Sequence, residues 1–317
     1  MVKPTFIGVG AQKCASSWIR DVLDDHPDVF VTRPREVDFF SHHYNRGYTW
    51  YERHFDEVGP ARAIGEISPS YFCDPLAPAR AREYNPNLKL ILALRDPIAR
   101  AFSNHLHEIR KGHFHGASLQ FETGLESNPM YVFQSRYGTH LARWLEFFPR
   151  SRVLVLVQEE IQSDPLAQAR QLYRFVGVNP DHQSALLYRP SHESVGARHP
   201  ALFKVWRTSG DFGRRHGLGA LVEGLKRLPP IARIMAGNRR DLRVEIPKMR
   251  RETEQALQRE LAAELTKLAQ LVGRYDWPWP AWHVAKATTA EGCYDVVGVR
   301  PPEVSVSARG APRTCNV

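Results

Sequence analysis

Residues 6–18 read FIGVGAQKCASSW, and residues 88–97 read LKLILALRDP. Each stretch is an apolar run of strand length followed by polar residues and then by a pattern typical of a helix. The first leads through a glycine-bearing turn to Lys13, and the second leads directly to Arg95. The unpaired N–H groups and the dipole at a helix start favour an anion. Two such turns side by side would suit a ligand with phosphate groups at both ends, such as a nucleotide.

Short apolar runs alternate with helical patterns as far as Val176, which is typical of a parallel sheet covered on both faces. The predicted strands are 5–9, 61–65, 88–94 and 152–157. The predicted helices are 16–25, 75–84, 97–111, 137–148 and 165–176, and a long helix is predicted over 247–275. We expect an α/β fold in one domain, residues 1–285, with a central parallel sheet flanked by helices and a mainly helical C-terminal part. Residues 286–317 are expected to form a loosely structured tail.

The composition is that of a soluble globular protein, with 317 residues, 43% of them hydrophobic, and a formal net charge of +9. No apolar run is long enough to predict a membrane span, and the N-terminus lacks the charged leader of a signal peptide. Cys14, Cys73, Cys293 and Cys315 show neither metal-ligand spacing nor a compact disulfide framework. We therefore expect a cytoplasmic protein without a bound metal.

The positive charge is concentrated between Arg198 and Arg250, where 13 Lys or Arg residues stand against 4 Asp or Glu residues, a difference of +9. Apolar and basic residues alternate here, so a basic helical segment is predicted over 198–250. It is either a solvated face or a surface for an acidic substrate, an acidic carrier or a membrane. Few aromatic residues are interleaved with the charge, so no nucleic-acid partner is expected.

The two turns have ordinary interpretations as well as functional ones. Residues 8–13 resemble a phosphate loop but lack Gly-Lys-Ser/Thr, so Lys13 could be a surface lysine on a simple strand-to-helix turn. Arg95 could be structural, with Asp96 acting as a helix cap. In the functional interpretation Lys13 reaches an anion, while Arg95 and Ser103, about two helical turns further on, bind a terminal phosphate.

Together with other blocks, these residues resemble the sulfotransferases that use 3′-phosphoadenosine 5′-phosphosulfate (PAPS), especially the heparan-sulfate type and its bacterial relatives. The matching blocks, in order, are 26–29 (HPDV), 35–40 (REVDFF), 47–51 (GYTWY), 65–71 (GEISPSY), 136–149 and 192–200. The resemblance covers residues 5–200 and implies a P-loop-like sulfotransferase fold. It also implies transfer of the sulfuryl group of PAPS to a hydroxyl, or less favourably an amine, of a small-molecule, sugar or lipid acceptor.

The resemblance also implies the roles of the site residues. Glu36 is the implied base, and Lys13 stabilises the leaving phosphate. The residues implied to bind the cosubstrate are Lys13, Cys14, Ala15, Ser16, Ser17, Trp18, Arg95, Ser103, Tyr137, Gly196 and Arg198. The chain departs from the family pattern in having Cys14-Ala15 in place of Gly-Gly and Ile67 in place of a lysine that assists the reaction.

Several alternatives remain open at this point. Other candidates for the base are Glu66, Asp38, His42, His43, His105 and His107. A kinase that uses ATP, or a non-catalytic module that binds a nucleotide or polyanion, would use a similar strand–loop–helix. The kinase is disfavoured because no carboxylate for magnesium is evident beside the turns.

Overall fold

The computed structural model describes residues 2–114, 116–189, 195–197, 239–241, 246–280, 282–284 and 297–299. Five parallel strands form the central sheet in the order β2-β3-β1-β4-β5. Their bounds are Phe6–Gly10 (β1), Val29–Val31 (β2), Ala63–Ile67 (β3), Lys89–Leu94 (β4) and Val153–Val157 (β5). Every residue of β1 and β3 is buried, as expected for strands covered on both faces. The predicted parallel α/β sheet is confirmed, and β2 is the strand that the prediction lacked.

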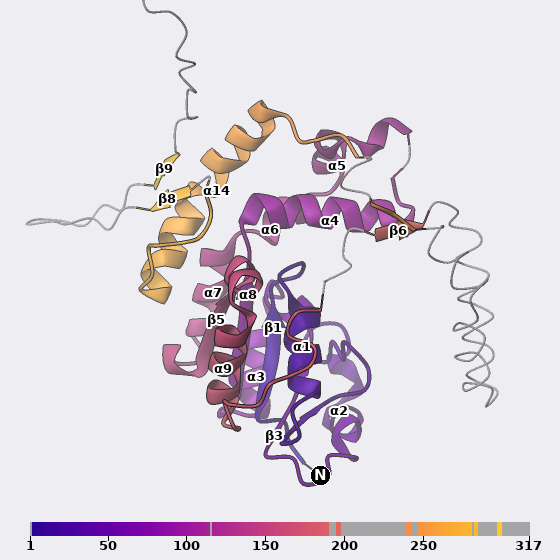
Figure 1. Cartoon of the computed structure of the whole chain (residues 1–317), viewed down its shortest axis with the longest axis vertical. Coiled ribbons are helices and arrows are strands. Elements are labelled where there is room, and N and C mark those ends of the chain that lie inside the picture. The colour runs from indigo at the N-terminus through magenta and orange to yellow at the C-terminus, as the bar shows by residue number, and fades with distance from the viewer. Residues whose placement is uncertain are drawn as a thin grey trace, which may run out of the picture.

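Helices lie on both sides of this sheet (Figure 1). The predicted ones are α1 (Ser16–Asp24), α3 (Ala77–Tyr84), α4 (Pro97–Lys111), α7 (Tyr137–Leu145) and α9 (Pro165–Val176). Four short helices were not predicted: α2 (Tyr48–Glu52), α5 (Phe121–Ser127), α6 (Met130–Phe133) and α8 (Gln158–Ser163). The helix α4 starts at the carboxyl end of β4 and extends across that edge of the sheet (Figure 1). Its side chains can therefore face the ends of the strands.

The predicted long C-terminal helix is α14 (Arg251–Val272), which packs against α7. The contact is close because Gly138 on α7 has no side chain: a Cβ there would lie 2.5 Å from the carbonyl oxygen of Glu264 on α14. The side chain of Glu264 accepts hydrogen bonds from the backbone N–H (2.8 Å) and the hydroxyl (2.7 Å) of Thr139. The mainly helical C-terminal part is thus fixed to the α/β core.

Two small antiparallel pairs complete the described chain. In one, β6 (Val195–Ala197) pairs with β7 (Arg239–Asp241). In the other, β8 (Trp282–Val284) pairs with β9 (Val297–Val299), so three residues of the predicted tail form a strand. Most of the predicted basic helical segment, 198–250, lies outside the described residues, as does the remainder of 286–317. None of the described helices combines the length and apolar character needed to cross a membrane.

Candidate active site at the ends of β1 and β4

The two turns that carry Lys13 and Arg95 open at the same edge of the sheet. Their strands, β1 and β4, are hydrogen-bonded neighbours, and the N–H of Ala11 donates to the carbonyl oxygen of Ala93 at 2.7 Å. Lys13 lies two residues after Ala11, and Arg95 lies two residues after Ala93. Ligands of open α/β sheets bind at the carboxyl ends of such strands. The predicted side-by-side arrangement of the two turns is therefore present.

The first turn adopts an unusual backbone that opens the start of α1. Lys13 and Ala15 have φ values of 68° and 60°, in the left-handed region that glycine tolerates best. The family's preference for glycine after the lysine is consistent with this geometry at Ala15. Ala15 immediately precedes α1 and offers no capping side chain, so the first N–H groups of the helix can serve a ligand. Cys14 is fully buried, with its Sγ 3.7 Å from the hydroxyl of Tyr137, and packs beneath the turn.

A cavity of about 680 Å³ lies over this turn. Five of the predicted site residues line it: Lys13, Ser16, Ser17, Trp18 and Glu36. The other lining residues are Gln12, Asp21, Arg35, Pro69, Asn104, His107, Glu108, Arg110, Lys111, Leu186 and Arg189. Five Lys or Arg side chains thus stand against three carboxylates in the lining, so the cavity favours an anion.

Glu36 lies in this cavity close enough to Lys13 for the two charges to interact. Although the side chain of Glu36 is exposed, partial desolvation by the surrounding protein raises its pKa; Asp38 raises it further, and Lys13 opposes the rise. The adjacent Arg35 forms its ion pair with Asp21, at 3.3 Å. No ion pair joins Glu36 to Arg33 or Arg35 within the described residues. A carboxylate of raised basicity in a substrate-sized cavity is suited to accept a proton.

Of the histidine candidates for the base, one lines the cavity and another is buried in the core. His107 lines the cavity, and the guanidinium of Arg110 donates to its Nδ1 at 2.7 Å. Desolvation, followed by the charges of Lys13 and Arg110, lowers the pKa of His107 to about 4. His105 is fully buried instead, with its ring nitrogens 3.2 Å from the Tyr131 hydroxyl and 3.0 Å from the carbonyl oxygen of Leu119. His105 therefore packs in the core.

The other candidates for the base, Glu66, Asp38, His42 and His43, are not among the lining residues. Glu66 is fully buried and accepts hydrogen bonds from Ser68 (2.6 Å), Tyr71 (2.7 Å) and Tyr51 (3.3 Å). Burial raises the pKa of Glu66 to about 7 in spite of these donors. These contacts point to a structural role beside the site.

Ile67 takes the place of the lysine that the family pattern has next to this glutamate. Its side chain is only 3% exposed and packs on β1, where a Cβ at Gly8 would lie 2.4 Å from its Cδ1. The position therefore belongs to the core of this chain. Among the described residues, Lys13, Arg35, Arg110, Lys111 and Arg189 are the strongly basic side chains that line the cavity.

Arg95, in the second turn, is buried, and its Nη1 has no hydrogen-bond partner in the part of the chain that the structure describes. Leaving a buried polar group unsatisfied is costly, and this cost falls when an anion binds. Arg95 therefore fits a phosphate. Ser103, on α4, is also buried. Neither residue is part of the cavity lining, whereas Asn104 and His107 of the same helix are.

The remaining predicted contacts lie apart from the cavity lining. Tyr137 is fully buried, and its hydroxyl donates to the carbonyl oxygen of Arg95 at 3.0 Å, so it supports the second turn from below. Gly196 lies in β6, which contacts α4. Arg198 lies outside the described residues. Within the described ranges, no group of three or more His, Cys, Asp or Glu side chains could hold a metal ion.

Sequence reasoning did not single out Asn104, Arg110, Lys111 or Arg189. The first three lie on α4 three or four residues from His107, a named candidate for the base, and this helical periodicity was the available signal. Arg189 comes from the other side of the cavity, after α9. Nothing in the local sequence around Arg189 indicates that position.

A parallel sheet in which two neighbouring strands lead into turns that carry a basic side chain is characteristic of the P-loop-like α/β proteins. The model of the family described as "Sulfotransferase domain" matches residues 3–191, and the chain belongs to this family. The resemblance noted in the sequence is confirmed.

Two mouse proteins illustrate the relationship. The chain is 30% identical over 210 residues to bifunctional heparan sulfate N-deacetylase/N-sulfotransferase 4, covering 59% of this chain and 24% of that protein. It is 31% identical over 180 residues to heparan sulfate glucosamine 3-O-sulfotransferase 6, covering 55% of this chain and 52% of that protein. The chain thus spans from about a quarter to about half of the length of these relatives.

A solved structure supports the fold. A sulfotransferase from Alicyclobacillus acidocaldarius superposes with a TM-score of 0.55 and 26% sequence identity, over 70% of this chain and 97% of that chain. The fold found here is therefore that of a sulfotransferase.

Proposed function

We propose that the chain is a sulfotransferase, that its sulfuryl donor is PAPS and that its acceptor is a hydroxyl group of an acidic carbohydrate. The observation that carries the choice of donor is the pairing of the Lys13 turn with the buried, incompletely bonded Arg95 on the neighbouring strand. One nucleotide with phosphates on its 5′ and 3′ sides would satisfy both turns. A nucleoside triphosphate carries its charge on one side and would leave Arg95 without a partner.

The residues of the site would share the work as follows. Lys13 and the hydroxyl and N–H groups of Ser16 and Ser17 would bind the 5′ end and stabilise the negative charge that develops on the leaving oxygen. Arg95, with Ser103 behind it, would bind the 3′-phosphate. Glu36 would accept the proton of the attacking hydroxyl. PAPS supplies the sulfuryl group, and adenosine 3′,5′-bisphosphate is released.

The proposed acceptor class is supported by the charge of the cavity. Of the five basic side chains that line it, only Lys13 is assigned to the 5′-phosphosulfate. The other four are Arg35, Arg110, Lys111 and Arg189. An acceptor with carboxylate or sulfate groups would match these cations. The names of both mouse relatives refer to heparan sulfate, an acidic polysaccharide.

The experiment that tests this proposal measures binding and transfer separately. Adenosine 3′,5′-bisphosphate is expected to raise the melting temperature of the full chain, whereas ATP with Mg²⁺ is not. With labelled PAPS, heparan-type oligosaccharides are expected to be labelled in preference to neutral sugars, phenols and lipids. Lys13→Ala should abolish transfer, while Lys267→Ala, at an exposed position on α14 that is not part of the cavity lining, serves as the control.

Two results would contradict the proposal. If ATP with Mg²⁺ stabilises the chain and the bisphosphate does not, the choice of donor is wrong. If neutral acceptors are labelled as well as acidic ones, the acceptor class is wrong even though the donor is right.

A further inference from the structure

The turn that carries Arg95 is held by residues far away in the sequence. The indole N–H of Trp282 donates to the Oδ2 of Asp96 at 2.9 Å. The backbone N–H of Asp96 donates to the Oε1 of Glu159 at 3.1 Å, and the indole N–H of Trp279 donates to the Oε2 of the same carboxylate, also at 3.1 Å. We call Trp279, Trp282, Glu159 and Asp96 the tryptophan clasp.

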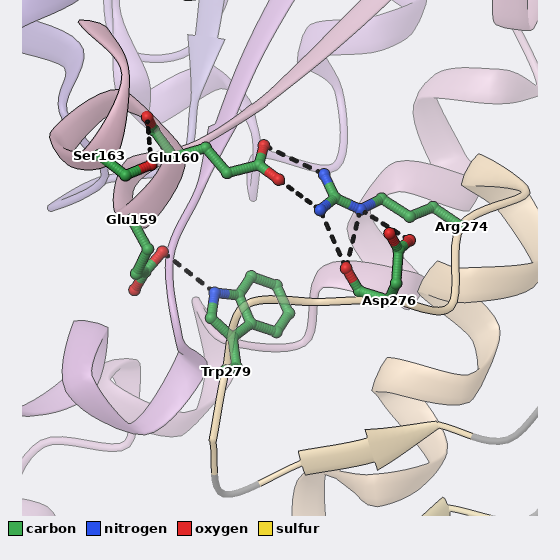
Figure 2. A network of polar contacts seen from close by, with 6 residues as sticks. All are labelled: Glu159, Glu160, Ser163, Arg274, Asp276 and Trp279. Atoms are coloured by element: carbon green, nitrogen blue, oxygen red, sulfur yellow. Dashed lines mark hydrogen bonds and ion pairs between the residues drawn. The ribbon is translucent and has the colours of Figure 1, made fainter.

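The clasp is anchored by an ion pair on the next residue of α8. The two terminal guanidinium nitrogens of Arg274, Nη1 and Nη2, donate to the two carboxylate oxygens of Glu160, and Arg274 also contacts Asp276 (Figure 2). Figure 2 shows Glu159 and Glu160 side by side on α8, each bonded to a residue of the C-terminal segment. Arg274 and Trp279 therefore both bind to α8, the helix that follows β5.

The contacts of the clasp restrain the backbone directly beside Arg95. The other carboxylate oxygen of Asp96, Oδ1, accepts from the N–H groups of Ile98 (2.9 Å) and Ala99 (2.8 Å) and so caps α4. Asp96 is thus bonded through its backbone N–H and both of its carboxylate oxygens. Since the next residue towards the N-terminus is Arg95, any rotation of this turn would move the guanidinium.

A restrained arginine matters because a partly unsatisfied buried guanidinium binds an anion best when it is already in place. We propose that the tryptophan clasp holds the buried Arg95 in register for the 3′-phosphate, so that Trp279 and Trp282 are positioning residues for the cosubstrate. This inference rests on the proposed function, because it assumes a ligand with a 3′-phosphate.

The chain offers a matched control in the same segment. Trp277 stacks on Trp279, with ring centroids 4.7 Å apart and an interplanar angle of 9°, and it is also buried. Its indole N–H has no hydrogen-bond partner among the residues that the structure describes. Replacing Trp277 with Phe therefore removes similar bulk without breaking a hydrogen bond of the clasp.

The test is calorimetric titration of the full chain with adenosine 3′,5′-bisphosphate and with adenosine 5′-monophosphate, which lacks the 3′-phosphate. Trp279→Phe and Trp282→Phe are each expected to weaken bisphosphate binding about tenfold and to leave monophosphate binding within about twofold. Trp277→Phe should leave both affinities within about twofold. In the transfer assay the two clasp variants should raise the KM for PAPS and leave kcat at saturation nearly unchanged.

The inference is overturned if the clasp variants weaken both ligands equally, if they weaken neither, or if Trp277→Phe has the same effect as Trp279→Phe. If the tryptophan variants do not fold, Glu159→Gln is the deciding variant. It keeps the shape of the side chain that accepts the hydrogen bonds of Asp96 and Trp279, and it is expected to weaken bisphosphate binding selectively in the same way. A wild-type chain that binds the two ligands equally well refutes the proposed function itself. If Arg95→Lys no longer binds the bisphosphate more tightly than the monophosphate, but the clasp variants still do, only the proposed role of the clasp is refuted.

Discussion

Glu36 and His107 line the same cavity, but their surroundings shift their pKa values in opposite directions. Desolvation and then Asp38 raise the pKa of Glu36, whereas desolvation and then Lys13 lower that of His107 to about 4. At neutral pH His107 is uncharged, and since its Nδ1 accepts from Arg110, its proton is on Nε2. His107 can therefore donate a hydrogen bond to a bound substrate, while Glu36 is the stronger base.

This difference predicts a pH–rate profile. Glu36 acts as a base only when it is ionised, so kcat should fall as the pH decreases through its raised pKa. Glu36→Gln is expected to lower kcat by about 10²–10⁴-fold and to abolish this acidic limb. His107→Gln, a neutral replacement in the same cavity, should cost less than about tenfold and leave the limb in place. A larger loss in His107→Gln than in Glu36→Gln would transfer the role of base to the histidine.

The element that positions Glu36 is the exit from β3, where buried hydroxyl groups hold the following loop. The Ser68 Oγ, which donates to Glu66, accepts from the N–H groups of Val37 (3.0 Å) and Asp38 (2.9 Å). The Tyr71 hydroxyl, which also donates to Glu66, accepts from the N–H of Phe39 at 2.8 Å. The backbone directly after Glu36 is thus bonded, through two hydroxyls, to one buried carboxyl group.

The carboxyl group of Glu66 makes stability depend on pH. In the folded chain burial raises its pKa to about 7, while in the unfolded chain it titrates near 4.3. The contribution of Glu66 to stability is fully present below the unfolded pKa and is lost as the pH rises through the folded pKa. Compared with Glu66→Gln, the wild type is expected to lose up to about 1.4 kcal/mol per pH unit between these values.

Denaturant unfolding of both chains between pH 5 and pH 8 measures this effect. Glu57→Gln, at an exposed position in the loop before β3, is the control for a general change in charge. If the free energies of unfolding of wild type and Glu66→Gln differ by the same amount at every pH in this range, Glu66 does not titrate there.

The sequence predicted some elements to the residue and missed others for physical reasons. The bounds of α4 and α9 were predicted because each helix has an Asp cap, a Pro at its first position and a Gly after its last residue. The three residues of β2 are too few to form a pattern. The adjacency of the Lys13 and Arg95 turns was a hypothesis that only the pairing of β1 with β4 could confirm.

Side-chain roles in the site were harder to predict because they depend on packing. Which residues of α4 face the cavity is set by the rotation of the helix on the sheet, so Asn104 was missed although the neighbouring Ser103 was named. Trp277, Trp279 and Trp282, interleaved with prolines after α14, indicate only that the end of this helix packs on the core. The hydrogen bonds of Trp279 to Glu159 and of Trp282 to Asp96 join segments more than 100 residues apart. Local sequence patterns do not reveal such contacts.

At the scale of the whole molecule, the C-terminal part supports the site through α7 and α14. Tyr137, at the start of α7, donates to the carbonyl oxygen of Arg95. The helix α14 packs on α7 and leads directly into Arg274 and the tryptophan clasp. Figure 1 shows α14 beside α7, on the side of the molecule away from α1 and α2. The second turn is therefore held by two elements that are themselves packed together.

This arrangement predicts that the α7–α14 contact is sensitive to a single methyl group. The Cβ introduced by Gly138→Ala would lie 2.5 Å from the Glu264 carbonyl oxygen and 3.1 Å from the Leu268 nitrogen, and neither backbone atom can move without displacing α14. We expect the free energy of unfolding to fall by about 1–3 kcal/mol, the usual cost of overpacking, in spite of alanine's better helix propensity.

The control for this prediction lies in the same contact between the two helices. Arg136 pairs with Glu260 at 3.1 Å, but both side chains are nearly half exposed, so Arg136→Ala should change stability by less than about 1 kcal/mol. Denaturant unfolding of the two variants gives the comparison. If Gly138→Ala is as stable as Arg136→Ala, the helices are not in close contact at this point. The support that α14 gives to the clasp would then have to come from the Arg274–Glu160 ion pair alone.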